Sequence, residues 1–342
     1  MVFKRLLGSI GIGGPTVDTD LAPGPVLPGG RLVGEVRLKG GRTAFDIEHI
    51  TLELTARVEA ETETDDGEHE GAVIFDRFKV GGGFRLDADE ERSLPFTVAL
   101  PWETPVTELH GQPIGIVLGV RTELGVAGAK DKGDLDPLRV GPLPVQEAVL
   151  EALGQLGFGF KSADLEYGRI GGTGQQLPFY QEIELTPAPR YAHAMREIEV
   201  TFLANAGGVE IVLEADKPRG LFSAGHDALT RFAVGHAGVE GRDWKTEVDG
   251  WMRQLAAGHG TRSVPAPHGP GDAYGAHADK GEHGHDHHQA GPGRGTVVAA
   301  GAAGLAVGVV GGVVAAEVVD EAGDFFEDLE GDDEEGAADE ED

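Results

Sequence analysis

The sequence predicts an all-β protein in which two β-sandwich domains follow one another along the chain. Short runs rich in β-branched residues alternate with Gly, Pro and Asp clusters over residues 16–125 and again over residues 161–234. A helix expected over residues 145–156 separates these two series, and a second helix over residues 242–255 closes the later one. Two halves of about 110 and 100 residues with this pattern are typical of sandwiches.

The individual strands are marked by alternation of apolar and polar residues. Ile50, Leu52 and Leu54 alternate with Thr51 and Glu53, which predicts one buried face and one wet face of an antiparallel sheet. Glycine pairs and triplets between the runs allow the positive φ angles of turns. The expected strands are 16–21, 32–39, 47–60, 72–80, 94–100, 114–124, 161–170, 179–186, 197–203, 209–215 and 228–234.

The chain divides into five segments by composition. The expected boundaries are 1–14 for an N-terminal amphipathic helix, 15–128 for the first sandwich, 129–157 for a linker with a short helix, 158–255 for the second sandwich with its closing helix, and 256–342 for a disordered low-complexity tail. The first helix is too short to be stable alone, so its apolar face must dock on its own domain, a partner subunit or a surface. The candidate self-association residues on that face are Phe3, Leu6, Leu7 and Ile10.

Charge and composition exclude several functions. The chain has 28 Lys and Arg residues against 59 Asp and Glu, and its net charge of −31 argues against nucleic acid as a partner. Residues 317–342 hold 15 acids and no Lys or Arg, so about half of the net charge belongs to the tail. The sequence has no Cys, which excludes disulfides and thiolate metal sites, and it shows no signal-peptide pattern. Both absences fit the cytoplasm.

The tail contains a histidine tract that could bind a divalent metal ion. The candidate ligands are His283, His285, His287 and His288, with Glu282 and Asp286 beside them. A tract of this kind in a low-complexity linker has no fixed geometry or second shell. A linker without a metal function, adventitious metal binding, and metal storage or sensing all stay open from the sequence.

Residues 296–316 form a second unusual segment of the tail. They are 21 uncharged residues, mostly Val, Ala and Gly, and a helix of this length would cross a bilayer core. The segment has one Leu and no aromatic residue, so its insertion free energy should lie near zero. Gly304, Gly308 and Gly312 would allow close helix packing. Membrane insertion, self-association and disorder are the three interpretations.

No catalytic or cofactor-binding residue is predicted, and therefore no enzyme and no cofactor. None of the five Ser residues lies in a Gly-x-Ser-x-Gly motif, and no phosphate-binding loop follows a strand. The acidic run 59–70 lacks the order of a calcium loop and is expected to be a solvated hairpin tip. Asp131, Asp134 and Asp136 are interpreted as turn caps and interdomain hydrogen-bonding groups, with a metal role as the alternative.

Several segments together resemble the bacterial sporulation-control family SpoOM, and the resemblance covers residues 1–255. In the family's order the matching segments are 3–13 (FKRLLGSIGIG), 17–19 (VDT), 28–41 (PGGRLVGEVRLKGG), 47–54 (IEHITLEL), 94–101 (LPFTVALP), 104–107 (TPVT), 131–136 (DKGDLD), 152–158 (ALGQLGF), 177–184 (LPFYQEIE), and 242–244 (RDW) with Trp251. Each motif is common by itself, and only their number and order are specific.

The resemblance implies an arrestin-like fold of two tandem β-sandwiches and a regulatory function without catalysis. Members of the family control sporulation or development and interact with cytoskeletal and division proteins, which makes protein partners, and a homodimer, the expected contacts. We therefore expect a cytoplasmic regulator or scaffold that acts through protein-protein interaction. The alternative is a membrane-tethered adaptor anchored by residues 296–316.

Overall fold

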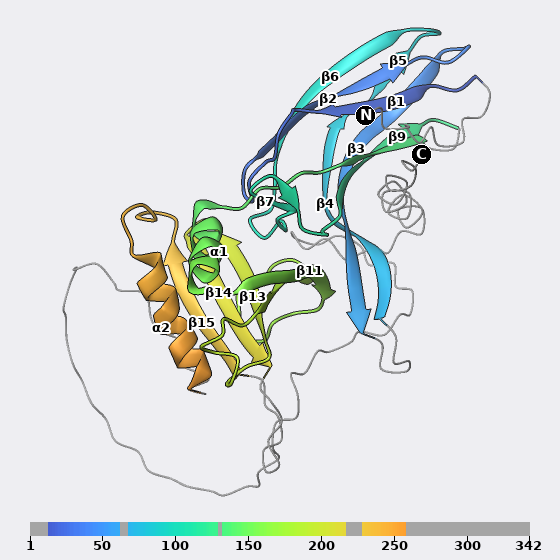
Figure 1. Cartoon of the computed structure of the whole chain (residues 1–342). Helices are drawn as coiled ribbons and strands as arrows, with labels where there is room; N and C mark the ends of the chain where they lie inside the picture. The colour runs from blue at the N-terminus through green and yellow to red at the C-terminus, as the bar shows by residue number, and fades with distance from the viewer. Residues whose placement is uncertain (1–12, 62–67, 129–131, 217–227, 258–342) are drawn as a thin grey trace, which may run out of the picture.

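The structure is a computed structural model, and it describes residues 13–61, 68–128, 132–216 and 228–257 (Figure 1). This part of the chain is mostly β, with strands β1 to β15 and two helices, as the sequence predicts. Neither helix has the length and hydropathy needed to cross a membrane. The first candidate helix, residues 1–12, and the tail from residue 258 lie outside the described residues.

The first part of the chain is a β-sandwich. One sheet has the order β1 (Thr16–Leu21), β2 (Arg31–Lys39) and β6 (Glu91–Ala99). The facing sheet contains β3 (Phe45–Glu61), β4 (Glu68–Gly81), β5 (Phe84–Leu86), β9 (Leu118–Val126) and β10 (Lys132–Pro137), and β7 (Glu108–Leu109) pairs with β8 (Gln112–Pro113) beside them. Apolar side chains of both sheets fill the core between them, among them Val36, Leu38, Ile50, Leu52 and Leu54.

The second part is one antiparallel sheet with helices on one face. Its strands follow in chain order as β11 (Gly159–Tyr167), β12 (Phe179–Thr186), β13 (Glu197–Asn205), β14 (Gly208–Asp216) and β15 (Ala228–Gly235). Helices α1 (Pro144–Leu156) and α2 (Trp244–Ala256) cover its apolar face (Figure 1). The described residues do not confirm a second sandwich, because two amphipathic helices bury the face that a second sheet would cover.

The expected linker 129–157 contains a strand that the sequence analysis missed. Residues 132–137 form β10, which pairs antiparallel with β9 at the edge of the sheet that contains β3. Asp134 and Asp136 break the apolar alternation by which a strand is recognised. The carboxylate of Asp134 instead accepts a hydrogen bond from the Thr19 N–H at 2.9 Å and so joins β10 to β1. This bond lies within the first part and is not interdomain.

Two connections join the parts: a parallel pairing of Glu59 on β3 with Glu166 on β11, which makes the two sheets continuous, and the loop that follows β6. Trp102 packs on the second core and stacks on His236, with ring centroids 5.0 Å apart. The Glu103 carboxylate accepts the backbone N–H groups of Gln176 and Leu177 at 2.8–2.9 Å. Further along, the Gln181 amide both accepts from the Val106 N–H and donates to the Val106 carbonyl. The junction is therefore both packed and hydrogen-bonded.

We expect Gly29→Ala to destabilise the protein more than Gly24→Ala. Both glycines have a positive φ, so alanine at either position should cost about 1 kcal/mol of backbone strain. A Cβ at Gly29 would also overlap the Trp102 ring, whereas a Cβ at Gly24 meets open space. Displacing the ring should raise the loss to roughly 2 to 3 kcal/mol. Urea denaturation of the two variants measures the difference, and equal losses would mean that Trp102 moves without cost.

Candidate functional site

In the sheet of the first part that contains β3, which we call the first sheet, the outward face of β3, β4 and β9 carries the main cationic cluster. Register places Arg77 and Arg121 on either side of Glu53, and Lys79 beside Thr51 one pair further along. Arg57 follows on β3 toward the hairpin end. We call the face that presents Arg57, Arg77, Lys79 and Arg121 the cationic face.

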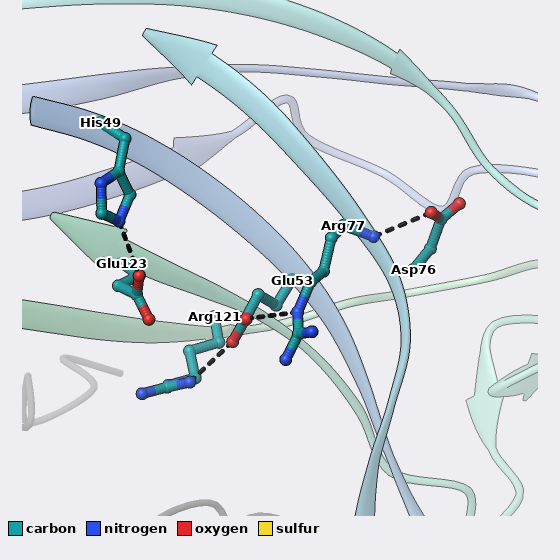
Figure 2. Close-up of polar contacts among 6 residues, drawn as sticks. All are labelled: His49, Glu53, Asp76, Arg77, Arg121 and Glu123. Carbon is teal, nitrogen blue, oxygen red and sulfur yellow. Dashed lines mark hydrogen bonds and ion pairs between the residues drawn. The ribbon is translucent and has the colours of Figure 1, made fainter. Parts of the chain in front are cut away.

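A buried carboxylate organises this face. The Glu53 side chain is only 4% exposed and accepts from Arg77 Nε at 2.8 Å and from Arg121 Nη1 at 2.6 Å (Figure 2). A buried charge is tolerated only with paired and hydrogen-bonded partners, so Glu53 holds both guanidinium groups in place. The sequence analysis expected a wet face here and was wrong about Glu53 and Thr55, both of which are buried. The missing signal was the pair of arginines on neighbouring strands.

Other groups around the cationic face are already paired or point away from it. The His49 imidazole lies 2.8 Å from a carboxylate oxygen of Glu123 on β9. Asp76 projects from the other side of β4 and accepts the Arg77 backbone N–H (Figure 2). Burial raises the pKa of Asp76, and that hydrogen bond partly opposes the shift.

The cationic face also has an apolar floor. Ile74 is 1% exposed and Ala72 is 4% exposed, although neither belongs to one of the two hydrophobic cores. Register sets Ile74 opposite Thr55 and Ala72 opposite Arg57. These two side chains therefore lie between the cationic groups on the outward side of the hairpin.

The outward face of the second sheet is acidic. It carries Asp164, Glu166, Glu182 and Glu199, and carboxylate oxygens of the first three lie within 4.8 Å of one another. Oxygen ligands of this kind suit a hard cation such as Ca²⁺ or Mg²⁺. The second sheet's further outward charges are Lys161, Glu184, Glu197, Glu210, Glu214 and Arg231.

Burial and neighbouring negative charges raise the pKa values of two carboxyl groups on this face. Burial first, and then Glu199 and Asp164, raise the pKa of Glu182 to about 9. Burial and then Glu214 raise the pKa of Glu199 to about 7. Beside them, the Lys161 ammonium group reduces the repulsion between Glu184 and Glu197, whose carboxylate oxygens lie 3.0 and 2.5 Å from its Nζ. The face therefore holds protons more tightly than separate carboxylates would.

A second acidic pair lies where β10 meets β1. Burial, and then the neighbouring carboxylates Asp134 and Asp18, raise the pKa of Asp136. Burial likewise raises the pKa of Asp134, while the Thr19 N–H lowers it. Asp134 therefore has a structural role in joining the two strands. Asp131 lies outside the described residues.

The other sequence-predicted site residues are not placed by the structure. The metal candidates His283, His285, His287 and His288 and the self-association candidates Phe3, Leu6, Leu7 and Ile10 lie outside the described residues, as do residues 62–67 of the acidic hairpin tip. Of the described serines, Ser93 and Ser162 donate to glutamates. Neither of these two contacts joins a serine hydroxyl to an imidazole.

These features define a β-rich protein of two joined parts that presents charged sheet faces. The family model of the SpoOM protein matches residues 3–219. The chain is 39% identical over 222 residues to the sporulation-control protein Spo0M of Bacillus subtilis, covering 64% of this chain and 82% of that protein. The Spo0M crystal structure matches with a TM-score of 0.62 and 31% identity, covering 71% of this chain and all of that one. The chain belongs to the SpoOM family.

We expect Glu182→Gln to remove part of the loss of stability at alkaline pH. Because the pKa of Glu182 is about 9 in the folded protein and near 4.5 when unfolded, the folded state keeps a proton that the unfolded state releases. Stability should therefore fall as pH rises from about 4.5 to about 9, by at most ~1.4 kcal/mol per unit for one group. Urea denaturation at pH 5 and pH 8 should show that the free energy of unfolding of the variant rises relative to that of the wild type only at pH 8.

Glu197→Gln is the matched control for this pH effect. It lies on the same face, but its carboxylate is paired with Lys161 and reaches solvent. It should keep the loss of stability between pH 5 and pH 8 that comes from Glu182, because the pKa of Glu182 is raised by burial and by Glu199, Asp164, Glu166 and Glu214 rather than by Glu197. A pH profile of Glu182→Gln that parallels the wild type would contradict the proton assignment.

Proposed function

We propose that the protein is a non-enzymatic regulator that acts through protein contacts in developmental or cell-division control, with the cationic face as its contact surface. Kinship with a sporulation-control protein supports the regulatory role. Cytoskeletal or division proteins and a second copy of the chain are the proposed partners, and the cytoplasm is the proposed location. The single observation that carries the choice of surface is the Glu53 network, which holds two arginines outward on a rigid sheet.

The physical reason for this choice is the charge of the rest of the molecule. The protein has a net charge of −31, and the outward face of its second sheet repels acidic partners. A fixed cationic surface in such a protein favours acidic partners and steers their approach. Because Arg77 and Arg121 are held by a buried carboxylate, little side-chain entropy remains to be lost on binding.

The double charge reversal Arg57→Glu with Lys79→Glu tests the contact surface. Both residues lie on the cationic face, and the two arginines that donate to Glu53, Arg77 and Arg121, are left in place by these substitutions. Proximity labelling in the native cell should lose its enriched partners, with at least about tenfold weaker binding of each isolated partner. Complementation of a deletion strain should fail in parallel.

Lys39→Glu with Arg85→Glu is the matched control, because both side chains are more than half exposed and lie on other strands. This control should retain partners and complementation. Equal loss in both variants would mean that overall charge matters rather than this face. A turnover of substrate abolished by one pocket substitution would contradict the non-enzymatic proposal.

A membrane-tethered adaptor is the second candidate function, and it depends on the 21 uncharged residues 296–316. If these residues insert, the full chain should sediment with membranes, and a chain ending at Leu255 should stay in the supernatant. Equal distribution of the two chains after cell fractionation would contradict tethering. A full chain in which the four histidines 283, 285, 287 and 288 are replaced by Gln shows whether metal binding by the tail contributes to this sedimentation.

A further inference from the structure

We propose that the acidic C-terminal segment, residues 317–342, binds the cationic face of its own chain. The segment carries 15 acids and no Lys or Arg. It lies beyond the residues matched by the family model, which end at residue 219. The proposal shares its surface with the proposed function, but the contact forms within one purified chain and needs no partner.

The outward sheet faces of the protein differ in their charge. The cationic face presents four cations against Glu53, which is buried beneath two arginines, and Glu123, which is paired with His49. The next outward pair toward the hairpin end is Glu59 opposite Glu70. Among the described side chains, the outward face of the second sheet has eight carboxylates and two cations, Lys161 and Arg231. A segment with 15 acids is repelled there. The neighbouring carboxylates already raise the pKa values of Glu182 and Glu199, which shows that even one more negative charge is unfavourable on this face.

The third outward face, that of β1, β2 and β6, has less positive charge available to an acidic segment. Its arginines and lysine are opposed by carboxylates on the same strands: Arg37 pairs with Asp20 and Glu35, and Lys39 with Glu91. No buried acid fixes these cations, whose side chains are at least half exposed. Of the three outward sheet faces, the cationic face is therefore the one on which an acidic segment gains most.

The length of the intervening chain permits the contact. The last described residue is Ala257, and 59 residues separate it from Glu317. A chain of 59 residues can reach up to roughly 200 Å, so its length does not prevent the segment from meeting the cationic face. Tethering within one chain typically gives an effective concentration on the order of a millimolar. A weak intrinsic affinity is enough to keep much of the segment bound.

Distance measurement by double electron–electron resonance on the full chain tests the proposal. The chain has no Cys, so two introduced cysteines alone carry spin labels. Gly331→Cys labels the segment, and Thr51→Cys labels the cationic face between Lys79 and Glu123. We expect a short, narrow distance component for this pair. Its matched control, Gly331→Cys with Thr97→Cys on the exposed face of β6, should give only a long, broad distribution.

Three changes should remove the short component. The first is 1 M salt, at which the Debye length is about 3 Å. The second is replacement of Asp332, Asp333, Glu334 and Glu335 by their amides, which leaves the folded part untouched. The double reversal Arg57→Glu with Lys79→Glu should act in the same way.

Three results would overturn the proposal. One is a broad distribution for the Thr51→Cys pair, and another is a short component for the Thr97→Cys pair instead. The third is a short component that appears when chains labelled singly at residue 51 and at residue 331 are mixed, because the segment would then bind a second copy. Partner capture by the charge-reversed chain reports on the proposed function separately.

Discussion

Strand β3 is the constraint on which the rest of the structure depends. Its 17 residues pair with β9 on one side and with β4 and β5 on the other, and its far end meets β11 at Glu59 and Glu166. A side-chain period of two fixes every residue of this strand to one face, so a slip by one position would put Glu53 into the apolar core. The buried charge therefore specifies register, while the core residues supply stability.

Segregation of charge follows from this register. Glu53 holds Arg77 and Arg121 on the outward face of the first sheet, whereas the second sheet collects carboxylates on its own outward face. The helices α1 and α2 cover the opposite face, so the acids of the second sheet are left where no helix neutralises them. One molecule thus has an attractive and a repulsive surface for the same acidic ligand, and Trp102 and Gln181 fix the two parts together.

The sequence predicted the strands whose alternation is strong, such as β1, β12 and β13, and both helices to within a few residues. It missed β10, because Asp134 and Asp136 replace the apolar residues that mark a strand. It missed the buried role of Glu53 for a different reason: the two arginines that neutralise it are 24 and 68 residues away along the chain. A network across strands depends on register, and register between distant segments cannot be derived from local periodicity. The resemblance to SpoOM was confirmed, and it carried no site residue with it.

If the acidic segment binds the cationic face as proposed, its tethering sets the conditions under which it can regulate. A segment held at an effective concentration of about a millimolar competes with a partner that is present at micromolar levels. Such a partner must bind the cationic face roughly a thousandfold more tightly than the segment does to occupy half of the molecules. Ionic strength weakens both contacts, but the tethered one is more sensitive if it depends on a larger share of exposed ion pairs. On this proposal the tail would raise the threshold for acidic partners without altering the fold that presents the face.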